Sequence, residues 1–126
     1  MEAWLEETIE TLSRAKADLA SALAGESLSE GEIWPVYVAV EVSVFDVKLA
    51  LGEDDVGRFV DMKELYKTGG RQLLKRALAS LERAHGELLA GDLRAALSSL
   101  RDARNRLRAH LRARRKEIQK LRRATA

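Results

Sequence analysis

The sequence predicts an all-α fold, an antiparallel bundle of four to five helices with a long basic C-terminal helix. Of the 126 residues, 46% are hydrophobic, 33% are charged and only one is proline, a composition typical of a helix-rich globule. Apolar residues recur at steps of three and four along most of the chain, which is the period of an amphipathic helix. A chain of this length fits one core, so we expect residues 1–126 to form a single helical domain.

The first predicted helix covers about Glu2–Ala24. Glutamates crowd its first turns, where they complement the positive end of the helix dipole, and Gly25 ends it. Lys16 is the one polar interruption of its apolar stripe. That stripe consists of Leu5, Ile9, Leu12, Leu19 and Leu23.

The segment Glu30–Leu51 fits both a strand and a helix. Every second residue from Val36 to Val44 is valine, as in a half-buried strand, but apolar residues also form two stripes at helical spacing. No other segment could pair with a lone strand, so we favour a helix buried at the centre of the bundle, surrounded by the first, fourth and fifth helices. Ser29 and Glu32 have the spacing of a capping box at its start.

Two further helices precede the last one. Asp54 and Asp55 can cap a short helix that runs to Tyr66, and a fourth helix covers about Arg71–Ala90. Gly91 then supplies a C-cap that is followed directly by an N-cap residue, Asp92. So tight a connection predicts an antiparallel hairpin of the fourth and fifth helices.

The last helix, residues 93–123, carries a coiled-coil-like seam of apolar residues that is interrupted by Arg104 and Arg114. A helix of this length measures about 46 Å, whereas a compact chain of 126 residues measures roughly 36 Å across. We therefore expect the basic end of this helix to project beyond the body of the domain.

The charge of the chain is strongly polarised. Residues 1–63 carry 14 acidic and 5 basic side chains, and residues 64–126 carry 6 acidic and 17 basic ones. This split indicates either two halves that attract each other or a basic surface for an anionic partner. Arginines on one ridge of the last helix could bind phosphates, although no aromatic residue is interleaved with them. The candidate residues for binding RNA or DNA are Arg101, Arg108, Arg112, Arg115, Lys116, Arg122 and Arg123.

Self-association is the other role that the last helix suggests. Its half-exposed seam could pair with a second copy, and arginines inside the seam would then fix the register. Trp4, Trp34 and Tyr37 are further large apolar groups for so small a chain. The candidate interface residues are Leu107, Leu111, Arg114, Ile118 and Leu121.

Familiar enzyme and cofactor sites have no support in the sequence. Cysteine is absent, which excludes disulfides and thiolate metal sites and favours the cytoplasm. Glu82 and His85 have the spacing of a di-iron ligand pair, but the second pair that such bundles need is missing. We expect no cofactor, no metal and no membrane insertion. Fifteen arginines, few amides and no cysteine give a thermophile-like composition.

Two short stretches resemble known families. Residues 104–110, RNRLRAH, resemble the Arg-x(4–6)-His element of HEPN-type ribonucleases and toxins, which implies catalytic roles on RNA for Arg104, Asn105 and His110. Residues 77–111 resemble helix hairpins of the tetratricopeptide type, but no 34-residue period recurs.

The sequence favours a non-enzymatic helical adaptor or assembly protein that acts by protein–protein association, including association with itself. Two alternatives stay open. One is a nucleic-acid-associated accessory protein that binds phosphates through the arginine ridge of the last helix. The other is a HEPN-like ribonuclease or toxin.

Overall fold

The computed structural model describes residues 1–25, 28–52, 65 and 69–125. Their four long helices are α1 (Ala3–Ala24), α2 (Glu30–Leu51), α4 (Gly70–Leu89) and α5 (Leu93–Thr125). No strand occurs within these ranges, so the predicted all-α class is confirmed. The short helix predicted between Asp54 and Tyr66 lies, apart from Leu65, outside the described residues, and the full number of helices stays a prediction.

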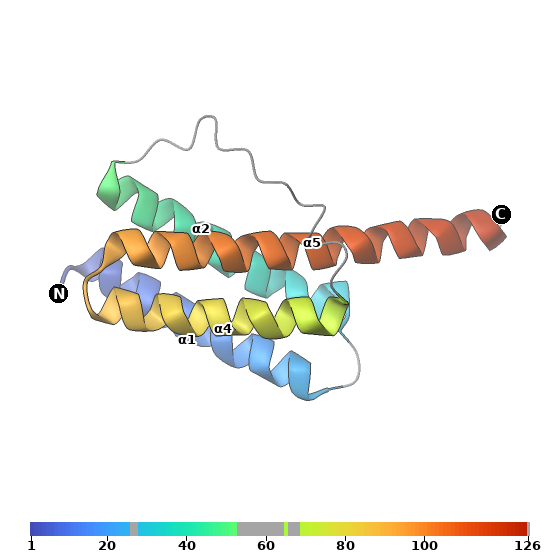
Figure 1. Cartoon of the computed structure of the whole chain (residues 1–126), viewed down its shortest axis with the longest axis horizontal. Helices are drawn as coiled ribbons and strands as arrows, with labels where there is room; N and C mark the ends of the chain where they lie inside the picture. The colour runs from blue at the N-terminus through green and yellow to red at the C-terminus, as the bar shows by residue number, and fades with distance from the viewer. Residues whose placement is uncertain (26–27, 53–64, 66–68, 126) are drawn as a thin grey trace.

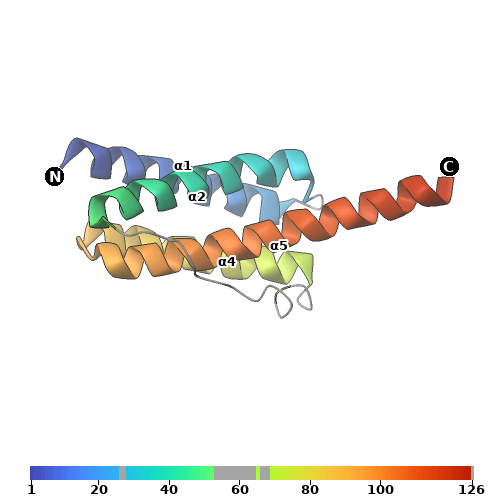
Figure 2. The same cartoon turned by 90° about the horizontal axis from the view of Figure 1, so that it is seen from above.

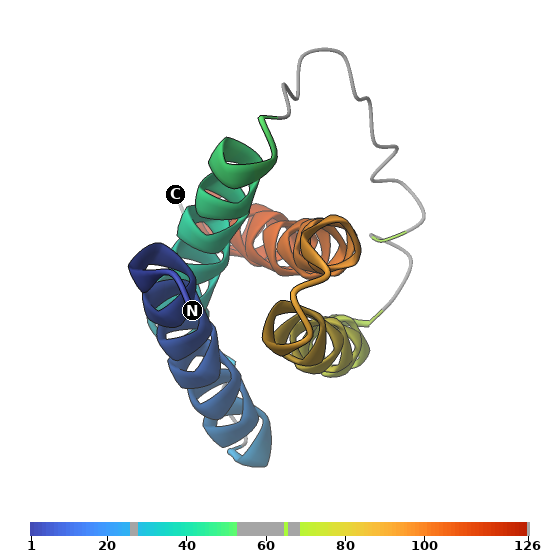
Figure 3. The same ribbon diagram turned by 90° about the vertical axis from the view of Figure 1, so that its left-hand side faces the viewer.

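The four helices form a closed ring in which each packs against two neighbours. Helices α1 and α5 each contact both α2 and α4 (Figures 1 and 3). Along the long axis, α1 and α5 run in one direction while α2 and α4 run in the other, so neighbouring helices are antiparallel (Figure 1). As a result, the end of α2 and the start of α4 lie at opposite ends of the bundle.

The core fills the middle of this ring. Helix α5 contributes alternating leucine and alanine, which lets it approach α4 closely, while α2 contributes β-branched valines. Two polar interruptions of the apolar stripes meet across the α1–α4 contact, where Lys16 Nζ lies 2.8 Å from His85 Nδ1. The largest fully buried side chains are Leu12, Leu19, Ile33, Val36, Val40, Leu73, Leu74, Leu81, Leu88, Leu97, Leu100 and Leu107.

The predicted helix ends are present in the structure. Ser29 caps α2 by accepting a hydrogen bond from the Glu32 backbone N–H at 3.3 Å, and Gly52 ends it in the left-handed conformation with φ of 67°. Between α4 and α5, Gly91 takes a φ of 78° and Asp92 accepts a hydrogen bond from the backbone of Ala95. These caps fix the tight α4–α5 hairpin.

The valine-rich segment is a helix, but its expected position at the centre of the bundle is wrong. Helix α2 packs against α1 and α5, and its opposite side faces solvent. The physical reason lies in the ring arrangement, because each helix has only two neighbours and a helix that is apolar all round keeps one face uncovered. Val36, Val40 and Val44 point into the core, whereas Val38 and Val42 point out.

Helix α5 changes character along its length. From Ala96 to Leu111 its apolar side chains are buried, whereas beyond Leu111 the described residues are exposed or half-buried throughout. The last turns of α5 extend past the ends of the other described helices (Figure 2). The helix has 33 residues, about 50 Å, against 22 residues or about 33 Å for α2.

Candidate functional site

The arginine ridge of α5 divides into an engaged part and an exposed part. In the engaged part, Arg108 is half-buried and its Nη2 lies 3.5 Å from Glu41 Oε2 on α2. Beside the ridge, in the seam, Arg104 is more deeply buried, and its Nε lies 3.5 Å from the other oxygen of Glu41. Arg101 is also half-buried. One carboxylate of α2 therefore contacts two guanidinium groups of α5 at the helix interface.

The exposed part begins one turn later, at Arg112. Arg115 donates from Nε to Glu30 Oε1 at 2.9 Å, so one carboxylate at the start of α2 reaches this part of the ridge. Among the described residues, no ion pair or hydrogen bond holds the side chains of Arg112, Arg122 or Arg123. Every basic candidate from Arg112 to Arg123 is exposed, Lys116 included. Two carboxylates of α2, those of Glu30 and Glu41, thus meet the ridge and neutralise it only in part.

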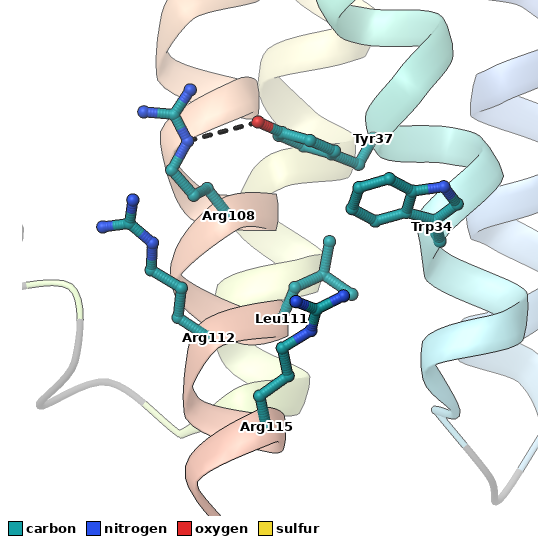
Figure 4. Close-up of a pocket in the computed structure, with 6 residues that line it drawn as sticks. All are labelled: Trp34, Tyr37, Arg108, Leu111, Arg112 and Arg115. Atoms are coloured by element: carbon teal, nitrogen blue, oxygen red, sulfur yellow. Dashed lines mark hydrogen bonds between the residues drawn. The ribbon is translucent and has the colours of Figure 1, made fainter.

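A pocket of about 180 Å³ lies where the first turns of α2 face the middle of α5 (Figure 4). Three arginines and two aromatic residues line it, and the buried side chain of Leu111 forms part of its wall. The lining residues are Trp34, Tyr37, Arg108, Leu111, Arg112 and Arg115. The fold therefore brings aromatic side chains beside the ridge.

Tyr37 is held in this pocket by a hydrogen-bond network, and Trp34 packs against its ring. The Trp34 and Tyr37 ring centroids lie 5.5 Å apart with an interplanar angle of 41°. The Tyr37 hydroxyl accepts from Arg108 Nε at 3.2 Å and donates to Glu41 Oε2 at 3.1 Å. Burial alone would lower the pKa of Arg108, but its contacts with Tyr37 and Glu41 raise it above the ordinary value. Arg108 therefore stays charged while it positions Tyr37.

Trp34 and Tyr37 were expected from the sequence to support self-association, and their position beside the ridge was not predicted because they lie about 70 positions before it. No aromatic residue is near the arginines along the chain, which spoke against base stacking, but the fold places two rings of α2 beside them. A usable signal was present in the i, i+3 spacing of Trp34 and Tyr37, which places both on one side of a helix.

A second surface is an apolar row on α2, which we call the α2 stripe. Its residues follow steps of four, three and four, and they are 41%, 49%, 59% and 65% exposed in chain order. This spacing is that of a coiled-coil seam. The stripe consists of Val38, Val42, Phe45 and Leu49.

The interface candidates on α5 fall in different surroundings. Leu107 and Leu111 are buried in the core of the chain itself, whereas Ile118 is half-buried and Leu121 is 66% exposed. Arg114 lies on the surface, 3.7 Å from Glu117 one turn later. The seam therefore leaves only its last two turns uncovered.

The residues of the HEPN-like element do not converge on one open site. Arg104 pairs with Glu41 of α2 and its Nε lies 3.4 Å from Asn105 Oδ1. His110 is buried at another side of α5, where its Nε2 lies 3.4 Å from the Leu28 carbonyl and its ring packs over Gly70. Desolvation lowers the pKa of His110, which favours a neutral ring that donates to this carbonyl.

Metal and membrane sites have no basis in the described part of the chain. No group of three or more histidine, aspartate or glutamate side chains there could hold a metal ion. None of its helices has the length and apolarity that crossing a membrane requires.

Neither a scan against protein-family models nor searches of curated proteins and of solved structures found a match for this chain.

Proposed function

We propose that this chain is a non-enzymatic assembly protein that associates with a second copy of itself through the α2 stripe. The observation that carries the proposal is the solvent exposure of Val38, Val42, Phe45 and Leu49 at seam spacing on one helix. A contiguous apolar patch on a small protein is typical of an interaction site.

The order of residues in the stripe supports an antiparallel pair of α2 helices. In that arrangement Val38 lies opposite Leu49 of the partner subunit, and Val42 lies opposite Phe45 of the partner subunit. Each large side chain thus meets a smaller one, as in a packed seam. The same patch serves both copies, which is the requirement for a two-fold symmetric dimer.

The charged residues beside the stripe also allow two antiparallel copies of α2 to attract each other. Glu41 and Lys48 are seven residues apart, so they lie on the same flank of α2. Antiparallel pairing brings this flank against the same flank of the partner, with Glu41 near Lys48 of the partner subunit. Such pairs favour one register and one orientation.

This proposal places the main contact on α2, where sequence reasoning had placed it on α5. Leu107 and Leu111 serve the core of each copy. Arg114, Ile118 and Leu121 stay candidates for additional contacts near the end of α5.

Sedimentation equilibrium of the wild type and of Phe45→Ala tests the proposal. Burying a phenylalanine contributes about 1.5–3 kcal/mol, and 59% of this side chain remains to be buried, once in each copy. The substitution should therefore weaken the dimer by about 2–4 kcal/mol, roughly 30-fold or more in dissociation constant. Leu89→Ala on α4, which removes a similarly exposed side chain, is the control.

Two results would contradict self-association through α2. One is a wild type that sediments as a monomer at about 100 µM, where even a complex of micromolar affinity is formed. The other is a dimer that Phe45→Ala leaves intact.

A second candidate function is the binding of a nucleic acid through the phosphates. The specific observation that favours it is the exposed part of the ridge, where Arg112, Arg122 and Arg123 have no carboxylate partner among the described residues. Each neutralised phosphate releases counterions, so affinity should fall steeply as salt is raised. A chain that binds no RNA or DNA at about 50 mM salt lacks this function.

A further inference from the structure

We propose that the pocket between α2 and α5 binds one unpaired nucleotide, with its base against Trp34 and its phosphate at Arg112. This inference deepens the nucleic-acid candidate and rests on it. It names the recognised group as a base with its phosphate, from a single-stranded nucleic acid or from a free mononucleotide.

The aromatic wall supplies the contact for a base. Trp34 is 45% exposed, so one part of its ring system is free for stacking. Its orientation is limited by Tyr37, which is itself fixed by hydrogen bonds to Arg108 and Glu41. A ring held in this way loses little conformational freedom when a second ring stacks on it.

The guanidinium groups supply the contact for a phosphate, and the three are not equivalent. Arg108 is engaged by Tyr37 and Glu41, and Arg115 is engaged by Glu30. Arg112 has no such partner in the described part of the chain, and it is exposed at the pocket. A phosphate bound there gains a charge-assisted contact without breaking an ion pair.

The size of the pocket limits the ligand. A volume of about 180 Å³ is smaller than that of sites enclosing drug-sized molecules, which measure about 300–1,000 Å³. The space suits a single planar ring system that stays open to solvent on one side. A base inside a duplex is already stacked on both faces, so the site selects unpaired bases.

A neighbouring hollow extends the site along α5. It measures about 260 Å³, shares Arg115 with the first pocket and continues to Arg122. Its other lining residues are Glu30, which pairs with Arg115, and Ile118 and Gln119. A further phosphate of the same strand can therefore follow the ridge toward the end of the helix. This continuity favours a strand over a free mononucleotide.

Binding is measured by quenching of Trp34 fluorescence in a Trp4→Phe background, which leaves one tryptophan. The probes are a single-stranded adenine octanucleotide, the corresponding duplex and adenosine monophosphate. We expect quenching by the single strand, with weaker binding of the duplex. Binding by the monophosphate in addition means that the pocket takes a nucleotide alone, and its absence means that a strand is required.

Two substitutions separate the base contact from the phosphate contact, each read by fluorescence anisotropy of a labelled octanucleotide. Trp34→Leu should weaken binding about tenfold, the scale of one stacked base. Arg112→Gln should lower the slope of log affinity against log salt by about 0.7, the value for one phosphate of a single strand. Leu89→Ala and Arg76→Gln remove an exposed apolar side chain and an exposed charge on α4 and should leave both quantities unchanged.

The possible results distinguish nucleotide binding in the pocket from the more general binding of phosphates by the ridge. Salt-dependent binding that Trp34→Leu does not weaken overturns the pocket and leaves phosphate binding by the ridge in place. Equal affinity for duplex and single strand also overturns it. A chain that binds none of the probes at about 50 mM salt overturns both proposals.

Discussion

Two valines separated by a single residue, Val40 and Val42, should respond very differently to substitution by alanine. Val40 is 0% exposed and Val42 is 49% exposed, because α2 turns its successive even positions to different sides. In a strand these two side chains would share a face. The two substitutions therefore test whether this segment is a helix and which of its sides is buried in the core.

The magnitudes follow from burial. Val40→Ala removes two buried methyl groups, about 1.6 kcal/mol of transfer free energy, and leaves a cavity that costs about 1 kcal/mol more. The higher helix propensity of alanine returns about 0.5 kcal/mol, so the free energy of unfolding should fall by about 2 kcal/mol. At Val42 the methyl groups are only about half-buried, so Val42→Ala loses about half of that transfer free energy. The helix propensity of alanine nearly offsets this loss, and the free energy of unfolding should change by less than about 0.5 kcal/mol.

Urea denaturation followed by circular dichroism measures both variants. With a slope of about 2 kcal/mol per molar urea, Val40→Ala should lower the midpoint by about 1 M, while Val42→Ala should leave it nearly unchanged. The protein concentration must lie below the dissociation constant of the proposed dimer, so that loss of association does not contribute. Equal destabilisation by the two substitutions would refute the orientation of α2 in which Val40 points into the core and Val42 points to solvent.

The remaining predictions concern pH and the end of α5. Burial and the neighbouring charge of Lys16 lower the pKa of His85, and burial likewise lowers that of His110. The unfolded chain therefore takes up protons first as pH falls through about 6.5, so the free energy of unfolding should decrease from pH 7.5 to pH 5.5. His85→Gln should reduce that decrease in urea denaturation, and a wild type that is equally stable at both pH values would contradict the assignment. Deletion of residues 119–126, whose described side chains are exposed, should change the free energy of unfolding by less than about 0.5 kcal/mol. A larger loss of stability would mean that the projecting end packs against something.

Much of the fold could be predicted from local sequence patterns, namely the capping residues and the apolar periodicity of the helices. The caps at Ser29, Gly52 and Gly91 depend on neighbours only a few positions away, and so do the helices that they delimit. The facing of α2 could not be predicted in the same way. A helix that is apolar all round carries no internal signal for which side a partner covers, and that choice is made by the ring of four helices.

The candidate site shows the same division. The arginines of the ridge are regularly spaced on one helix, so their common face could be predicted. The carboxylates that meet them, Glu30 and Glu41, and the rings of Trp34 and Tyr37 come from α2. The position of these side chains beside the ridge depends on how α2 packs against α5. Residue spacing along the chain does not predict that packing.

The opposite directions of α2 and α5 would determine the shape of the proposed dimer. Each α5 points past the start of its own α2 (Figure 2). Antiparallel pairing of the two α2 helices would therefore direct the two α5 ends away from each other. The two basic ends would then lie at opposite extremes of the assembly. A short strand could occupy only one of them, so it would gain no avidity from the second copy. Such a dimer is suited to bridge two separate anionic partners, and its valency would matter more than the affinity of either end.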